Sequence, residues 1–147
     1  MLISNISADD ITIGIAADGW EDAIEKSAKT LLDKGFIEPS YVDAMIQVVK
    51  DNGPYIVISK HIALAHARPE CVVNKMGVTF ATLNPPVEFG AGQLDPVKII
   101  ITLAATDNNA HIDVMGELAE LLMDEEKIPA MAGSESSEEF LRILRGS

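Results

Sequence analysis

Three histidines are the side chains of this 147-residue sequence that are best suited to chemistry, because imidazole can bind a metal, move a proton or act as a nucleophile near neutral pH. His61 and His66 lie five positions apart in the segment HIALAHARPE, which also contains Arg68, and His111 lies much further along the chain. Three chemistries could use such a set: zinc binding, acid–base catalysis beside a serine nucleophile, and reversible phosphoryl transfer.

The third chemistry makes the fewest demands on these residues. A zinc site needs three or four ligands, and the three histidines do not form a recognisable ligand pattern, so a metal-dependent hydrolase is the weakest alternative. No G-x-S-x-G motif supplies a serine nucleophile. A phosphoryl carrier needs one nucleophilic imidazole nitrogen, a fixed tautomer and nearby donors for the phosphoryl oxygens. His66, Arg68, His111 and the N–H groups at a helix start would meet these needs.

Composition limits the partners and the compartment. The formal net charge of −12 disfavours binding to a nucleic-acid backbone. The single Cys71 excludes an internal disulfide and fits a reducing compartment. Apolar runs such as IIITLAA (99–105) are too short to cross a bilayer, and the N-terminus lacks the basic start of a signal peptide. We therefore expect a cytoplasmic protein without a nucleic-acid partner.

Hydrophobic periodicity predicts the elements that position these residues. Strands are expected at 10–17, 55–59, 77–83 and 97–105, with the NPP segment at 84–86 ending the third. Helices are expected within 18–35, 39–53, 106–125 and 134–144. Capping boxes are expected at Asp18/Glu21 and Ser136/Glu139, and Tyr41 is placed on the apolar side of its helix.

These elements predict a single α/β domain over 1–147 with its sheet between helical layers. Segment 97–105 is apolar enough to be buried on both faces, so we expect it at the centre of the sheet. His61 and His66 are expected at or just after the end of the strand at 55–59, and His111 in the first turn of a helix. Ligands commonly bind at such strand ends.

The run GPYIVISKHIALAHARPE (53–70) resembles the phosphorylation loop of enzyme IIA components of the bacterial sugar phosphotransferase system, in the mannitol–fructose superfamily and nearest its ascorbate-type branch. The resemblance continues through GFIEPSYVDAMI, TLNPPVEF, DPVKIIITLAATDNNAH and MGELAELL, and so covers most of the chain. It implies a mixed β-sheet flanked by helices on both sides and a phosphotransferase that works through a phosphohistidine without a cofactor.

The resemblance also implies roles for individual residues. His66 would accept a phosphoryl group from HPr on its Nε2 atom and pass it to a cognate enzyme IIB, serving the membrane permease IIC indirectly in ascorbate-type uptake. His111 matches the family's second active-site histidine and would donate to a phosphoryl oxygen. Arg68 would also donate to the phosphoryl group, hold the loop or contact a partner.

The sequence departs from the family pattern around the nucleophile. His61 replaces the usual glycine, Ala65 the usual proline and Ala67 a common glycine, while Val48-Val49 replaces an Arg-Glu pair. The glycine at the first position implies that no imidazole is needed there, so we expect His61 to have no chemical role. These departures predict an altered loop geometry and leave a phosphorylation-dependent regulatory module as the alternative function.

Overall fold

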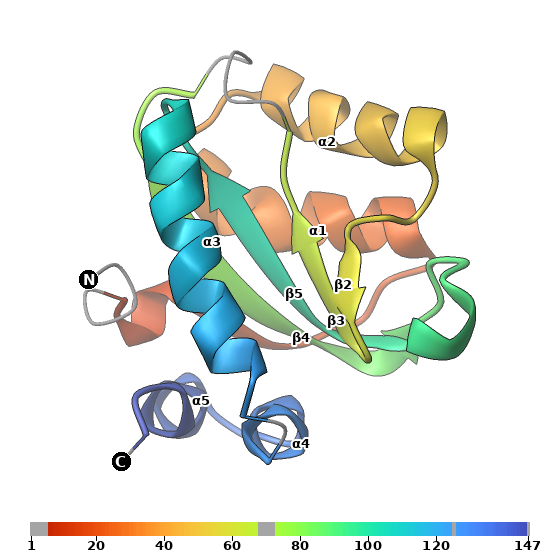
Figure 1. The fold of residues 1–147 in the computed structure, drawn as a ribbon, viewed down its shortest axis with the longest axis vertical. Helices are drawn as coiled ribbons and strands as arrows, with labels where there is room; N and C mark the ends of the chain where they lie inside the picture. The colour runs from red at the N-terminus through yellow and green to blue at the C-terminus, as the bar shows by residue number, and fades with distance from the viewer. Residues whose placement is uncertain (1–5, 68–72, 125, 147) are drawn as a thin grey trace.

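The computed structural model describes residues 6–67, 73–124 and 126–146 (Figure 1). Its strands are β1 (Ile11–Ile15), β2 (Val57–Ser59), β3 (Ile62–Ala65), β4 (Gly77–Val87) and β5 (Val97–Ala104). Its helices are α1 (Trp20–Asp33), α2 (Pro39–Asn52), α3 (Asn108–Leu122), α4 (Lys127–Ala132) and α5 (Ser137–Leu144), and short 3-10 helices span Ala8–Asp10 (η2) and Gly92–Leu94 (η3).

The five strands form one mixed sheet in the order β1-β4-β5-β3-β2. Strand β5 pairs parallel with β3 and antiparallel with β4, while β1 is parallel to β4 and β2 is antiparallel to β3. The prediction that segment 97–105 forms the central strand is therefore confirmed. Its burial on both faces follows from its composition, because a strand covered by helices on both sides cannot alternate between apolar and polar residues.

Helices cover both faces of the sheet, so the predicted fold class is confirmed (Figure 1). Ile100 and Ala104 of β5 belong to the core beneath α1 and α2. Ile99 and Ile101 of the same strand belong to the core beneath α3, α4 and α5. This division follows from the alternation of side chains along a strand. Among the described residues, no helix is both long enough and apolar enough to cross a membrane.

Two strand predictions require correction. The histidine segment is not a loop after a strand at 55–59, because it contains a strand of its own, β3, joined to β2 by a tight turn. His61 occupies that turn with φ +72°, a left-handed conformation that reverses the chain. The prediction that NPP ends the strand at 83 was also wrong: β4 continues to Val87, which pairs with Val97 after a shift of register. Prolines are tolerated at such an irregularity, where ladder hydrogen bonds are interrupted.

The helix ends agree with the sequence in most respects. Pro39 opens α2 and Gly53 follows its end, as expected. Ser136 accepts a hydrogen bond from the N–H of Glu139, as a cap should. The prediction of a capping box at Asp18 was wrong. Helix α1 begins after Gly19, one residue later than that box requires. The N–H of Asp18 instead donates to Asp22, and this bond together with Lys26 lowers the pKa of the Asp22 carboxyl group. Helix α4 was not predicted.

Candidate active site

The sheet topology brings the exit of β3 and the start of α3 to the same edge of the molecule. His66 directly follows β3, whose last residue, Ala65, pairs with Thr102 of the parallel strand β5. Because parallel strands end at the same edge of a sheet, the exits of β3 and β5 are neighbours. Helix α3 follows β5 (Figure 1). The backbone of His111 lies in the first turn of this helix. The side chain of His111 and the whole of Arg68 lie outside what the structure describes.

The imidazole of His66 is held in one tautomer by a neighbouring backbone group. Its Nδ1 atom lies 2.8 Å from the carbonyl oxygen of Leu64. Since a carbonyl oxygen can only accept a hydrogen bond, Nδ1 carries the proton and the lone pair of the neutral ring is on Nε2. The His66 side chain is half-buried, which leaves part of the ring within reach of a reactant.

An aromatic contact also constrains the His66 ring. The ring of Tyr55 meets it edge-on, with centroids 5.9 Å apart and planes at 85°. Tyr55 is 49% exposed, so the two rings form part of the protein surface. Tyr55 was not singled out from the sequence, because its proximity to His66 arises when the β2–β3 hairpin folds back on itself.

A buried hydroxyl group connects the segment after His66 to the central strand. The Tyr41 hydroxyl donates to the carbonyl oxygen of Leu103 at 2.8 Å and accepts from the N–H of Ala67 at 3.2 Å. The sequence placed Tyr41 correctly on the apolar side of α2 but gave it no other role. One signal was available, because a buried tyrosine hydroxyl normally requires a hydrogen-bond partner.

His61 lies at the opposite end of β3 from His66, in the turn that joins β2 to β3. Its Nδ1 atom is 2.7 Å from the carbonyl oxygen of Pro96. Its backbone N–H donates to Leu94, and its carbonyl oxygen accepts from Lys98. These bonds tie the hairpin to the start of β5. The structure therefore separates His61 from His66 and from the start of α3.

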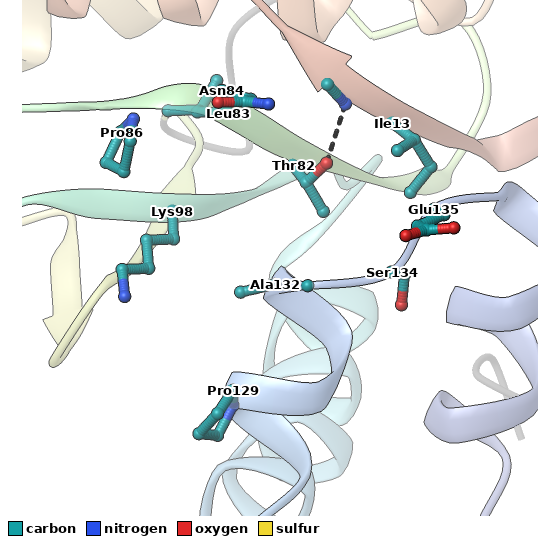
Figure 2. Close-up of a pocket in the computed structure, with 12 residues that line it drawn as sticks. Ile13, Thr82, Leu83, Asn84, Pro86, Lys98, Pro129, Ala132, Ser134 and Glu135 are labelled. Atoms are coloured by element: carbon teal, nitrogen blue, oxygen red, sulfur yellow. Dashed lines mark hydrogen bonds between the residues drawn. The ribbon is translucent and has the colours of Figure 1, made fainter.

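A hollow of about 590 Å³ lies between the sheet and α4 (Figure 2). Figure 2 shows Lys98 of β5 and Pro129 of α4 on its walls. Lys98 lies near the start of β5, whereas His66 follows the end of the strand parallel to it, so this hollow is separate from the candidate site. In the described part of the chain, no group of three or more His, Cys, Asp or Glu side chains is placed to hold a metal ion.

The fold and the sequence comparisons together identify the class of this protein as an enzyme IIA component of a phosphotransferase system. More particularly, the chain belongs to the family described as phosphoenolpyruvate-dependent sugar phosphotransferase system, EIIA 2, whose model matches residues 4–147. The enzyme IIA family expected from the sequence is therefore confirmed.

Relatives with different named sugars resemble the chain to a similar degree. The ascorbate-specific PTS system EIIA component of Shigella boydii serotype 4 (strain Sb227) is 34% identical over 91% of this chain and 88% of that protein. The solution structure of the mannitol-specific cryptic phosphotransferase enzyme IIA of Escherichia coli has a TM-score of 0.88 at 33% identity, covering 99% of this chain and 100% of that one.

A third similar structure includes a partner protein. It is a complex of the Escherichia coli mannitol enzyme IIA with phosphorylated enzyme IIB. Its matching chain has a TM-score of 0.84 at 33% identity and covers 97% of this chain and 99% of its own length. The two enzymes IIA therefore share a fold across nearly their entire lengths.

Proposed function

We propose that this protein is a phosphocarrier whose His66 accepts a phosphoryl group from HPr on Nε2 and passes it to a cognate enzyme IIB. The observation that carries the proposal is the position of His66 at the exit of β3, at the edge of the sheet where α3 starts, with its lone pair directed to Nε2 by the bond from Nδ1 to the carbonyl oxygen of Leu64. A half-buried imidazole in that tautomer is suited to act as a nucleophile at a strand exit.

The transfer exchanges one bond to phosphorus for another. The Nε2 lone pair of His66 forms the new P–N bond while the bond to the donor breaks, and the donor atom keeps that electron pair. Positive charge develops on the imidazole as the bond forms. The Leu64 carbonyl oxygen, already hydrogen-bonded to Nδ1–H, stabilises that charge without reorganising. In transfer to enzyme IIB, a nucleophile of the acceptor forms the new bond to phosphorus while the P–N bond breaks. The electron pair of that bond returns to Nε2, which regenerates the neutral ring.

The start of α3 supplies an environment for the phosphoryl oxygens. The first N–H groups of a helix have no partner within the helix, and the helix dipole favours negative charge at that end. The exit of β3 and the start of α3 lie at the same edge of the sheet. We assign His111 as a donor to a phosphoryl oxygen, and Arg68 as a second donor or a loop residue, on the family resemblance.

Exposed apolar side chains near this edge suit successive partners. Tyr55 contacts His66 and is 49% exposed, and Ile112, next to His111 in α3, is 67% exposed. A donor and an acceptor that use the same nitrogen must dock on the same surface in turn. From its relatives we assign enzyme IIB as the acceptor and ascorbate-type uptake as the process. On the family resemblance we assign the membrane permease IIC as an indirect partner and the cytoplasm as the compartment.

Phosphorylation from purified components tests the carrier role. With phosphoenolpyruvate, enzyme I and active HPr, the protein is expected to gain one acid-labile, base-stable phosphate, detected by intact-mass spectrometry and located on His66 by fragmentation. His66→Gln is expected to gain none. Absence of added phosphate on the wild-type chain, with an HPr that phosphorylates another enzyme IIA, would overturn the proposal.

The choice of sugar is tested separately. The phosphorylated protein is offered the enzyme IIB of an ascorbate system and, in parallel, that of a mannitol system. Faster transfer to the ascorbate enzyme IIB is expected. Faster transfer to the mannitol enzyme IIB would overturn the ascorbate assignment while leaving the carrier role intact.

A further inference from the structure

The Tyr41 hydroxyl group connects two backbone segments that the sheet itself no longer connects. The last paired residues of β3 and β5 in the described ladder are Ala65 and Thr102. Tyr41 then accepts from the N–H of Ala67 at 3.2 Å and donates to the carbonyl oxygen of Leu103 at 2.8 Å. The hydroxyl therefore extends the link between β3 and β5 past the end of their hydrogen-bonded ladder.

The two linked groups flank the candidate site. Ala67 directly follows His66, and Leu103 precedes the connection from β5 to α3. Both residues are buried, and Tyr41 itself is 2% exposed, so water is excluded from these bonds. A single side chain thus fixes the backbone beside the nucleophile relative to the strand that leads to the helix start.

The alanine side chains on either side of His66 cannot provide this connection. Ala65 and Ala67 on either side of His66 carry only methyl groups, which neither donate nor accept hydrogen bonds. The hydrogen bond from His66 to Leu64 is local to its own segment, so it orients the ring relative to the segment but does not place the segment in the molecule. The Tyr41 hydroxyl links this segment to the central strand beyond the last paired residues, Ala65 and Thr102.

We propose that Tyr41 is a positioning residue for phosphoryl transfer at His66. Through Ala67 and Leu103, its hydroxyl group sets the position of the imidazole relative to the start of α3, where the phosphoryl oxygens would bind. The proposal rests on the proposed function, because it assigns His66 as the nucleophile. Transfer depends on near-contact alignment of the reacting atoms, so release of the segment should slow the reaction more than it weakens docking.

Tyr41→Phe removes only the hydroxyl group and tests the proposal directly. We expect the rate of phosphorylation at saturating phospho-HPr to fall about 10-fold or more, with the half-saturating concentration of phospho-HPr nearly unchanged. In the unphosphorylated protein, the Ala67 N–H should exchange with solvent faster than in the wild-type protein, while the ¹⁵N chemical shifts of the His66 ring keep the tautomer that Leu64 fixes. A purely structural role would lower stability without changing the rate of phosphorylation of the folded protein.

Val49→Ala provides the matched control. Val49 is 5% exposed, lies in the same helix and the same core, and is two helical turns away from Tyr41. It is expected to lower the urea midpoint while leaving the phosphorylation rate within about twofold of wild type. A Tyr41→Phe variant with a wild-type rate, or a Val49→Ala variant slowed as much, would overturn the proposal.

Amide hydrogen exchange keeps the inference testable if Tyr41→Phe does not fold. In the wild-type protein, the Ala67 N–H should exchange at least about 100-fold more slowly than in an unstructured peptide. Exchange at the peptide rate would contradict the hydrogen bond from Ala67 to Tyr41 and overturn the proposal. If the wild-type chain accepts no phosphate, the proposed function fails. The exchange rate of the Ala67 N–H then still decides whether Tyr41 holds this segment.

Discussion

His61 and His66 hydrogen-bond in the same way at opposite ends of strand β3. Nδ1 of His61 lies 2.7 Å from the Pro96 carbonyl oxygen, and Nδ1 of His66 lies 2.8 Å from that of Leu64. Both rings are therefore held in the same tautomer. Their surroundings differ, because His61 closes a turn at the start of β5, whereas His66 follows β3 near the start of α3. Tautomer alone thus does not identify the nucleophile; the topology separates the two candidates.

The left-handed backbone of His61 predicts how substitutions there affect stability. At φ +72°, glycine avoids a conformational cost of about 1 kcal/mol that other residues pay. Both His61→Gly and His61→Ala lose the bond to Pro96, but the alanine variant also keeps the strained backbone. In urea denaturation we expect His61→Ala to be about 1 kcal/mol less stable than His61→Gly. An alanine variant at least as stable as the glycine variant would contradict this explanation.

Variants of both histidines test which one carries phosphate. His61→Gly is expected to accept phosphate on His66, whereas His66→Ala and His66→Gln accept none. Fragmentation mass spectrometry of the phosphorylated samples provides the measurement. Residual phosphate on a His66 variant, mapped to His61, would show that the site has moved or been duplicated within an unchanged fold.

Replacement of His111 tests the donor assigned to the start of α3. His111→Gln should slow both phosphorylation by HPr and transfer to enzyme IIB, by a factor on the order of 10²–10³, because one preorganised donor is weakened while the nucleophile remains. Glu120→Gln, an exposed change near the end of the same helix, serves as the control. Rapid-quench kinetics that show wild-type rates in both steps for His111→Gln would remove His111 from the site.

Two glycines in different surroundings predict opposite effects of the same substitution. A Cβ atom on Gly77, at the start of β4, would lie 2.6 Å from a ring carbon of Phe36, so Gly77→Ala should cost about 1–3 kcal/mol of stability. Gly116, inside α3, has open space around it, so Gly116→Ala should stabilise the protein by about 0.5–1 kcal/mol. Thermal unfolding of both variants distinguishes them, and a stabilised Gly77→Ala would refute the close packing at Phe36.

Much of the fold could be read from local patterns. The apolar run of β5 indicated burial on both faces, and Pro39 with Gly53 marked the limits of α2. The predicted strand boundaries were wrong where the conformational preference of a few residues competed with long-range strand pairing. Pro85 and Pro86 suggested the end of a strand, yet pairing of Val87 with Val97 resumes beyond them. The turn at His61 escaped prediction because residues other than glycine uncommonly adopt a left-handed conformation. Here backbone hydrogen bonds to Leu94 and Lys98 hold it.

By itself, the sequence determined the enzyme IIA family, the sheet between helical layers and the candidate His66, because motifs and periodicity are properties of contiguous residues. The tertiary structure decided which groups meet. The parallel pairing of β3 with β5 brings His66 to the end of the sheet where α3 begins, and the packing of α2 on that sheet places the Tyr41 hydroxyl between Ala67 and Leu103. Such contacts join residues far apart in the chain, so their geometry arises only when the strands pair and the helix packs against them.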